Sequence, residues 1–306
     1  MIRLALTVLT LAACAGSSPA PSRPRAAELA AAFAAAMSAH DAHAAAALFA
    51  PDASVALVEG SELHGCVATE AALADLLVRF SVVRVAIGRQ WLARDASVIE
   101  LVLTAMRANR PVGVAAAAVV ALDRSGQITS ARLFVDIPTL VGQIDPAKLP
   151  EGARTRAAIS GPPAGTAITT STGSPTEAAN LASADASWAR LDAHDPAGVL
   201  AAAAPGYVYD DFAGPAPLDE AGTRALLERW LGMVPDFRIA AEPTHFAAGD
   251  DVITESVEQM TFRGNAITLR GLDIKHLERG RVTREWQYAN GAGALAALLG
   301  IKLVLP

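Results

Sequence analysis

The sequence contains little of what marks several large classes of protein. Aromatic residues make up only 5% of the 306 residues, so the position of each tryptophan and tyrosine is informative. The 25 lysines and arginines form no basic stripe and are outnumbered by 31 aspartates and glutamates, which argues against a nucleic-acid partner. Hydrophobic residues reach 52%, but much of this is alanine, which buries little area per residue, so hydropathy overstates the core.

Long apolar runs are also missing beyond the N-terminus. The run from Val112 to Leu122 is too short to span a bilayer and fits a buried strand. No cluster of histidine, cysteine and carboxylate residues has the spacing of a metal site, and no nucleophile elbow or phosphate-binding loop is present. We therefore predict no metal and no cofactor. Cys66 is interpreted as a small buried apolar residue rather than a nucleophile.

The N-terminal residues have the pattern of an export leader. Arg3 supplies a positive charge, and the apolar run Leu4–Ala13 is too short to span a bilayer. The run ends in Leu-Ala-Ala-Cys, which resembles the bacterial lipobox, whose cysteine is lipidated before cleavage on its N-terminal side. The alternative is an ordinary secretory leader with a chance cysteine.

The lipobox interpretation assigns the whole N-terminal segment. Residues 1–13 are a signal peptide, Cys14 carries the lipid, and residues 14–25 are a tether. Because acyl chains confer membrane affinity, the chain is predicted to be exported and anchored in the cell envelope. Ala15, rather than an aspartate, follows the cysteine, and in Gram-negative lipoproteins this resemblance implies sorting to the outer membrane.

An internal repeat divides the rest of the chain. Four matches share an offset of 154 residues: Ala39-His40-Asp41 with Ala193-His194-Asp195, Pro51 with Pro205, Gly126 with Gly280, and Ile128 with Val282. Such a fixed period indicates two copies of one domain, at residues 26–145 and 176–300. Residues 146–175 between them include a Gly/Pro/Ser/Thr-rich segment and are interpreted as a linker.

Both copies have the same predicted order of elements. An alanine-rich helix comes first, then a short helix capped by Asp41 or Asp195, a strand and a third helix. Four β-rich runs follow, in the second copy at about 236–247, 251–262, 266–277 and 282–289, and a short helix closes each copy. Helices first and a long antiparallel sheet afterwards predict an α+β fold, in which a curved sheet wraps around three helices.

Several motifs carry a family resemblance. They are Pro235-Asp236-Phe237-Arg238, Leu272-Asp273-Ile274, the run from Gly280 to Trp286, and Phe134-Val135-Asp136 followed by Leu140 and Gln143. With the order of elements, they resemble the NTF2-like superfamily and its SnoaL-like polyketide cyclases. The resemblance covers nearly all of both copies and implies two tandem cones, each with a deep pocket between the sheet and the helices.

The resemblance also implies that the last strand of each cone contributes pocket residues. Strand residues two apart share a face, so Arg132, Phe134 and Asp136 are predicted to line the first pocket. For the second pocket we predict a ligand-binding set of aromatic and polar residues: Tyr209, Trp230, His276, Trp286, Tyr288 and Asn290. The alternative is that these aromatic side chains simply belong to the core.

Asp136 is the candidate catalytic residue. In SnoaL-like cyclases an aspartate in this region acts as a general base, and a carboxylate in an apolar cavity is a better base at neutral pH. His64 is the candidate acid partner. The alternative is that Asp136 caps the helix that begins near Pro138. Asn290, its counterpart in the second copy, cannot serve as a base.

Two functions therefore remain open. The first is a membrane-tethered binding protein that holds a small, largely apolar ligand in a cone pocket, with domain-domain or homodimer pairing through the sheet faces. The second is a cyclase, isomerase or hydrolase that uses Asp136 as a general base in the first copy and needs no cofactor. The sequence favours the first.

Overall fold

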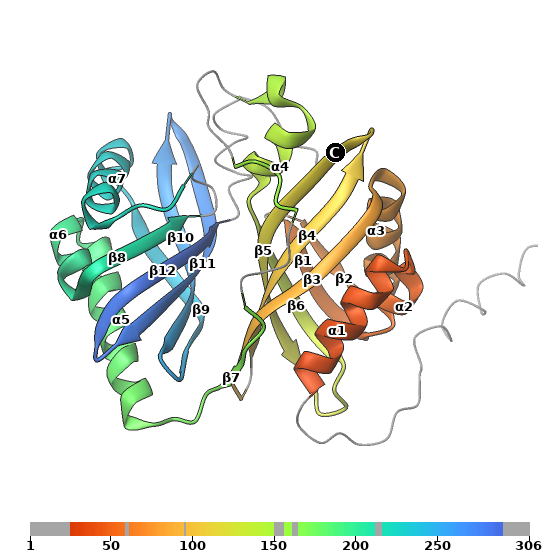
Figure 1. Ribbon diagram of the computed structural model, residues 1–306, viewed down its shortest axis with the longest axis horizontal. Helices are drawn as coiled ribbons and strands as arrows, with labels where there is room; N and C mark the ends of the chain where they lie inside the picture. The colour runs from red at the N-terminus through yellow and green to blue at the C-terminus, as the bar shows by residue number, and fades with distance from the viewer. Residues whose placement is uncertain are drawn as a thin grey trace, which may run out of the picture.

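The computed structural model describes residues 25–58, 61–94, 96–149, 156–160, 165–211 and 216–289. Two sheets stand next to each other in the middle of the molecule, and the helices lie mainly on the two outer sides (Figure 1). Cys14 and Asn290 lie outside the described residues, as does the segment predicted to form the last helix of the second copy. We call the two halves the first cone and the second cone.

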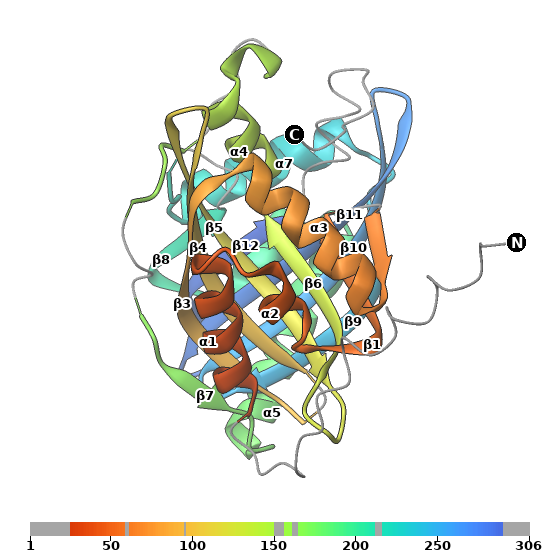
Figure 2. The same cartoon turned by 90° about the vertical axis from the view of Figure 1, so that its right-hand side faces the viewer.

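The first cone contains a seven-stranded sheet. Its elements are α1 (Arg25–Ser38), α2 (Ala42–Ala46), β1 (Phe49–Val58), β2 (Ser61–His64), α3 (Gly65–Arg79), β3 (Ser81–Leu92), β4 (Ser97–Arg107), β5 (Arg110–Leu122), β6 (Ile128–Val135), α4 (Ile137–Ile144), the 3-10 turn Pro146–Lys148 and β7 (Ile168–Thr170). The strand order is β2-β1-β6-β5-β4-β3-β7. Helices α1, α2 and α3 cover one face of this sheet (Figure 2).

The second cone repeats this plan with five strands. Its elements are α5 (Pro175–Asp192), α6 (Pro196–Val199), the 3-10 turn Leu200–Ala202, β8 (Ala203–Asp211), α7 (Glu220–Met233), β9 (Arg238–Ala248), β10 (Asp251–Phe262), β11 (Asn265–Glu278) and β12 (Arg281–Ala289). The strand order is β8-β12-β11-β10-β9. Because β8 corresponds to β1 and β12 to β6, the two cones share one topology.

The repeat in the sequence produces matching local structure. The Asp41 side chain accepts a hydrogen bond from the Ala44 backbone N–H at 2.8 Å and begins α2. Asp195 accepts one from Gly198 N–H at 2.9 Å and begins α6. Such caps satisfy backbone donors at the helix N-terminus. The predicted caps of both short helices are therefore confirmed.

The α+β fold of two tandem cones is confirmed, with one difference in the sheets. β1 pairs with β6, and β8 with β12, in parallel. Each sheet is therefore mixed rather than wholly antiparallel. The linker also contributes to the fold, because β7 pairs in parallel with β3. Gly113 is needed where the linker crosses β5, since a Cβ there would lie 1.9 Å from the Ile159 carbonyl oxygen.

The two sheets pack against each other through the faces that point away from their own helices. One buried apolar cluster takes residues from both cones: Trp91, Val98, Ala115, Ala117, Val119 and Phe134 from the first, and Ala248, Ile253, Leu272, Ile274, Trp286 and Tyr288 from the second. Each sheet is therefore covered on both faces, by helices on one side and by the other sheet on the opposite side.

Buried polar pairs join the same two faces. The Arg132 guanidinium donates to both carboxylate oxygens of Glu255, at 2.6 and 2.7 Å, and Glu255 is fully buried. Tyr288 OH donates to Glu100 at 2.6 Å, and Trp91 Nε1–H donates to Asp251 at 2.7 Å. These contacts fix the register of one sheet on the other. Among the helices of the described residues, none is long and apolar enough to cross a membrane.

Candidate functional site

Each cone contains a cavity between its sheet and its helices. The first cavity has a volume of about 360 Å³. Its wall is largely apolar and is formed by α1, α3 and the inner faces of the strands, including Phe33, Leu73, Leu101, Ala118 and Leu133. Many of the lining residues are alanines, and such small side chains leave the space unfilled. The alanine content of the sequence thus produces a cavity here rather than a dense core.

The second cavity has a volume of about 200 Å³ and a different wall. On the helix side it is lined by apolar residues of α5 and α7 such as Trp188, Leu227 and Trp230. On the sheet side, Leu269 and Ala289 are apolar, and the other strand residues that line the cavity are polar or charged: Tyr207, Tyr209, Asp211, Glu258, Asp273, Lys275, Glu285 and Gln287. This polar wall is the main difference between the two cavities.

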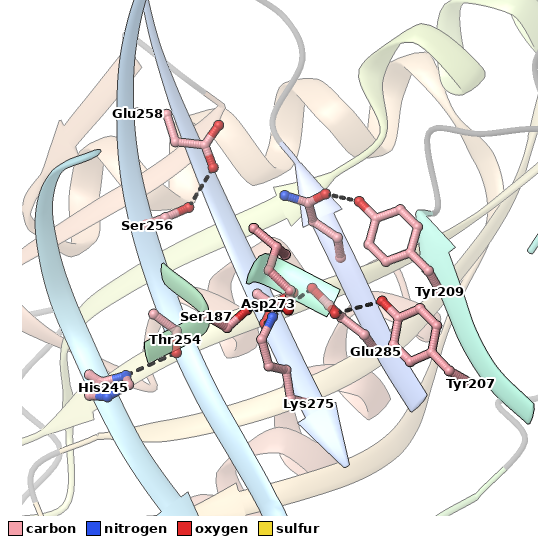
Figure 3. A network of polar contacts seen from close by, with 12 residues as sticks. Ser187, Tyr207, Tyr209, His245, Thr254, Ser256, Glu258, Asp273, Lys275 and Glu285 are labelled. Carbon is pink, nitrogen blue, oxygen red and sulfur yellow. Dashed lines mark hydrogen bonds and ion pairs between the residues drawn. The ribbon is translucent and has the colours of Figure 1, made fainter. Parts of the chain in front are cut away.

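A buried ion cluster forms the centre of this wall (Figure 3). Lys275 Nζ donates to Asp273 Oδ1 at 2.9 Å and to Glu285 Oε1 at 2.6 Å. Tyr207 OH donates to the other Glu285 oxygen at 2.8 Å. Tyr209 OH donates to Gln287 Oε1. The Lys275 side chain is only 4% exposed, so water contributes little to its solvation.

The two carboxyl groups of the cluster have pKa values shifted in opposite directions. Burial raises the pKa of Asp273 well above its ordinary value, and the Glu285 carboxylate raises it further against the opposing effect of Lys275. Burial acts on Glu285 in the same direction, but the Lys275 ammonium and the hydrogen bonds from neighbouring side chains outweigh it and lower the Glu285 pKa. The surroundings therefore favour the protonated form at Asp273 and the ionised form at Glu285.

Glu258 is a second buried carboxyl on the same wall. Its Oε1 accepts a hydrogen bond from Ser256 Oγ at 3.0 Å. Burial raises the pKa of Glu258 to about 7, and the charge of Asp211 adds to this. Gly271 makes room for the pair, because a Cβ there would lie 3.0 Å from Ser256 Oγ.

Strand pairing shows which residues of the two cones correspond. On the last strands, Leu133 of β6 corresponds to Gln287 of β12, at the offset of 154 residues. Their strand partners, Ala118 of β5 and Asp273 of β11, correspond at an offset of 155 residues, because the turn between the two strands is one residue shorter in the second cone. The polar wall then replaces small or apolar residues: Ser256 corresponds to Leu101, Glu258 to Leu103, Asp273 to Ala118, Lys275 to Val120, Glu285 to Ala131, Gln287 to Leu133, Tyr207 to Ala53 and Tyr209 to Val55.

The structure corrects the predicted face of the last strand in the first cone. Phe134 lies in the apolar cluster between the two sheets. Arg132 is among the residues that border the first cavity, but its guanidinium pairs with Glu255 of the other cone. The neighbours Ala131, Leu133 and Val135 line the cavity instead. The predicted alternation was right, but it was assigned to the wrong side of the sheet.

The same correction applies to most of the predicted set in the second cone. Trp286 and Tyr288 lie between the sheets rather than in the cavity. The half-exposed His276 ring contacts Asp251 at 2.7 Å. The same Asp251 accepts the hydrogen bond from Trp91 in the interface. Tyr209 and Trp230 do line the second cavity, as predicted. Asn290 is outside the described residues.

Asp136 and His64 are not brought together. Asp136 is 5% exposed, and its Oδ1 accepts the Thr139 backbone N–H at 3.0 Å, so it caps α4. Burial raises the pKa of Asp136, while the hydrogen bonds from Thr139 act against this. His64 is exposed at the start of α3 and makes no side-chain capping bond. Neither residue is among those that line the first cavity.

The sequence analysis missed the cluster of Asp273, Lys275 and Glu285, although a signal was present. Asp273 and Lys275 alternate with Leu272 and Ile274 on one strand, and Glu285 and Gln287 flank Trp286 on the next. An aspartate and a lysine two apart in a buried strand must share a face and be paired. Within the part of the chain that the structure describes, no three histidine, cysteine or carboxylate side chains are grouped so as to hold a metal ion.

Comparisons with known proteins agree with this architecture. The SnoaL-like domain family matches residues 30–131 and again residues 184–285, with the same 154-residue offset as the internal repeat. No curated protein matches the chain. The two matches of the SnoaL-like domain family together cover well over half of the chain.

Solved structures with a similar fold each cover less than half of the chain. A hypothetical protein with a ketosteroid isomerase-like fold from Catenulispora acidiphila, solved with trimethylamine, is 24% identical over 38% of this chain and 92% of its own, with a TM-score of 0.36. AclR, described as a putative hydroxylase from Streptomyces galilaeus, is 19% identical over 40% and 97%, with a TM-score of 0.37. A putative SnoaL-like polyketide cyclase from Jannaschia sp. CCS1 is 16% identical over 42% and 97%, with a TM-score of 0.37.

The internal repeat, the two cones of one topology and the two family matches at the same offset agree with one another. The resemblance inferred from the sequence motifs is confirmed: the chain belongs to the SnoaL-like domain family and carries two such domains in tandem.

Proposed function

We propose that the first cone binds a small, largely apolar molecule, and that the chain holds this molecule at a membrane through a lipid on Cys14. The observation that carries the proposal is the cavity of about 360 Å³ inside the first cone. Ligand pockets typically have volumes of 300–1,000 Å³ and mostly apolar walls. An apolar cavity of about 150 Å³ already accepts benzene, so this one has room for a molecule of about two fused rings.

The chemistry of the wall supports an apolar ligand. The strand residues at the centre of the wall are Leu101, Ala118, Val120 and Leu133, none of which can hydrogen-bond through its side chain. Burying apolar ligand surface against them contributes about 25 cal/mol per Å². Among the polar lining residues, Asp75 and Arg79 lie on the exposed side of α3, the buried Thr69 hydroxyl already donates to Gly65 O at 3.0 Å, and Arg132 pairs with Glu255. A ligand is thus held by its shape and apolar surface.

Ala118 provides the test, since it lies on β5 in the middle of the cavity wall and is partly accessible. We expect naphthalene, a neutral apolar fluorescent molecule of two fused rings, to bind the chain, and Ala118→Leu to weaken this binding tenfold or more by filling the cavity. Ala71→Leu on the exposed side of α3 is the matched control and should leave the affinity unchanged. Equal affinity in the two variants would reject the proposal.

The membrane part of the proposal has its own test. Wild-type protein from the native host should carry a lipid mass on Cys14 and sediment with membranes, whereas Cys14→Ser should be unmodified and leave the membrane fraction. An unmodified wild-type cysteine would reject the anchor but not the binding site. Native mass spectrometry of the same preparation should detect a bound small molecule, which Ala118→Leu should lose.

A further inference from the structure

The second cavity contains a buried carboxyl group that its own surroundings leave half-satisfied. Glu258 is 4% exposed and lines the cavity from β10. Its Oε1 accepts the Ser256 hydroxyl at 3.0 Å, whereas no described residue bonds to Oε2 and no described cation contacts the group. An ionised carboxylate in such a place requires a cation, and a protonated one would have an O–H without an acceptor. In either form Glu258 has room for a partner in the cavity.

The fold does not require this carboxyl group. Leu103 takes the corresponding position in the first cone and lines the first cavity. The second cone also has Gly271 where the first has Ala116, and a Cβ at Gly271 would lie 3.0 Å from Ser256 Oγ. Apolar residues in place of buried charges are often at least as stable. A structural role therefore does not explain why the second cone buries Glu258.

The other charges of the wall do not neutralise this group. The charged residues that line the cavity are four acidic residues and one lysine: Asp211, Glu258, Asp273, Glu285 and Lys275. Lys275 is already engaged, because its Nζ donates to Asp273 and Glu285. Even with Asp273 protonated, the lining residues carry a net negative charge once Glu258 ionises. Such a wall repels an anionic ligand and attracts a cationic one.

Asp211 strengthens the negative potential at Glu258. Its charge raises the pKa of Glu258 in addition to the effect of burial, so the two side chains interact with the same sign. Arg156 donates to the Asp211 backbone carbonyl at 3.1 Å and to the Asp210 side chain, but Arg156 does not line the cavity. A cation bound at Glu258 would be attracted by both acidic side chains.

Aromatic rings complete an environment for an organic cation. Aromatic residues make up only 5% of the chain, yet five of them line this cavity: Trp188, Tyr207, Tyr209, Trp230 and Phe237. A cation is attracted to the face of such a ring. The cavity wall already shows this interaction, since Lys275 Nζ lies 5.0 Å from the centre of the Trp188 ring. The same wall thus holds one ammonium between carboxyl groups and an aromatic ring.

The size of the cavity limits the ligand to about one ring. The volume of about 200 Å³ exceeds the roughly 150 Å³ that accepts benzene, which leaves space for a short substituent. Leu226, Leu227 and Trp230 of α7 provide apolar surface on the helix side of the cavity. A ring with an ammonium on a short arm therefore matches both the apolar side and Glu258 on the sheet side.

We propose that the second cone binds a small primary amine in its protonated form, with an apolar body of about one ring and an ammonium that pairs with Glu258. This ligand differs in charge from the apolar molecule proposed for the first cone. The two cavities share no lining residue, so the result for one site does not decide the other.

Three probes of similar size test the requirement for a positive charge. Benzylamine carries the ammonium, benzyl alcohol is its neutral analogue, and benzoate is an anion. Isothermal titration calorimetry at pH 8 should give an affinity for benzylamine at least tenfold higher than for benzyl alcohol, with benzoate the weakest. Equal affinity for the amine and the alcohol, or tighter binding of benzoate, would overturn the proposal.

Glu258→Gln tests the residue that pairs with the ammonium. Glutamine keeps the size of the side chain and an acceptor for Ser256 Oγ, so the shape of the cavity is retained. The variant should lose at least tenfold in affinity for benzylamine and stay within about twofold of wild type for benzyl alcohol. Glu228→Gln on the exposed side of α7 is the matched control and should change neither. Undiminished benzylamine binding in Glu258→Gln, or an equal loss for both probes, would show that the Glu258 charge does not hold the ligand.

The pH dependence of binding gives a second readout of the same pair. Burial raises the pKa of Glu258 to about 7, and a bound ammonium favours the ionised carboxylate. Benzylamine stays protonated between pH 5.5 and pH 8, so its affinity should rise roughly tenfold or more over this range as Glu258 ionises. The affinity should not change with pH in Glu258→Gln. A wild-type affinity that is constant or falls with rising pH would contradict the pairing.

Two variants locate the bound amine. Leu227→Trp fills the second cavity from α7 and should abolish benzylamine binding. Ala118→Leu fills only the first cavity and should leave benzylamine binding unchanged. Benzylamine binding that responds to Ala118→Leu but not to Leu227→Trp would place the amine in the first cone and reject the second site.

Discussion

Glu258 makes the stability of the second cone dependent on pH, and Glu258→Gln should remove that dependence. The carboxyl group is buried, its pKa is raised from 4.5 to about 7, and its surroundings are Ser256, Asp211 and Gln287. In the unfolded chain the pKa returns to its ordinary value. The folded chain therefore holds a proton that the unfolded chain has lost over this pH range.

The magnitude and sign follow from this difference. A group that binds a proton more tightly in the folded state stabilises that state fully below the unfolded pKa, and this contribution disappears as the pH rises through the folded pKa. Raising a pKa from 4.5 to about 7 corresponds to about 3 kcal/mol, at 1.36 kcal/mol per pH unit. Between pH 5 and pH 8 we expect a loss of about 2.5 kcal/mol.

Urea unfolding followed by tryptophan fluorescence measures this difference. Near pH 5, wild type and Glu258→Gln should have similar stability, because glutamine keeps an acceptor for Ser256 Oγ. At pH 8 the variant should be more stable by about 2.5 kcal/mol. The pKa of Asp273 is raised as well, but Asp273 is present in both proteins, so the comparison isolates Glu258.

The matched control is Glu228→Gln on the exposed side of α7, which should follow the wild-type pH dependence. If wild type and Glu258→Gln lose stability in parallel from pH 5 to pH 8, Glu258 is ionised throughout in the folded chain. The account of Glu258 as a buried carboxyl group with a raised pKa would then be refuted.

Two further variants test the contacts around the cavities. Arg132→Met removes the hydrogen-bonded partner of the fully buried Glu255, which keeps only the Arg270 guanidinium at 3.9 Å, and should cost about 3 kcal/mol in urea unfolding. Combining it with Glu255→Met should recover most of the loss; similar stability of the single and double variants would contradict the pairing. Asp136→Ala removes the cap of α4 and should cost about 1 kcal/mol, while Asp136→Asn keeps an acceptor and should cost less; equal losses would argue against the cap.

The sequence predicted the architecture because local and repeated signals agreed. The 154-residue offset is read directly from the sequence. The caps at Asp41 and Asp195 and the order of the strands along the second copy depend on local sequence signals that tertiary contacts do not override. β7 was missed because its three residues become a strand only by pairing with β3, far away in the sequence. A segment that short carries no period of its own.

The candidate site was predicted on the wrong face for a physical reason. Alternation along a strand separates two faces, and hydrophobicity then identifies the inner one if the other is in water. Here both faces are buried, since Trp286 and Tyr288 pack between the sheets while Glu285 and Gln287 line a cavity. In the second cone the more apolar face is the interface, and the more polar face is the inside of the cone. Choosing Trp286 and Tyr288 as pocket residues therefore placed the pocket on the wrong face of the last strand.

The pattern of replacement between the two cones indicates where they diverged. At the interface, some corresponding positions keep their character: Glu100 and Glu255 are both buried carboxylates in hydrogen bonds across or along the interface, and Phe134 corresponds to the aromatic Tyr288, although Arg132 corresponds to Trp286. Inside the cones, apolar positions of the first copy become charged or hydroxyl-bearing in the second. A change at the interface must fit the opposite sheet, whereas a change inside one cone meets only its own cavity. Joining two cones in one chain therefore lets one interior turn polar while the packing of the sheets remains.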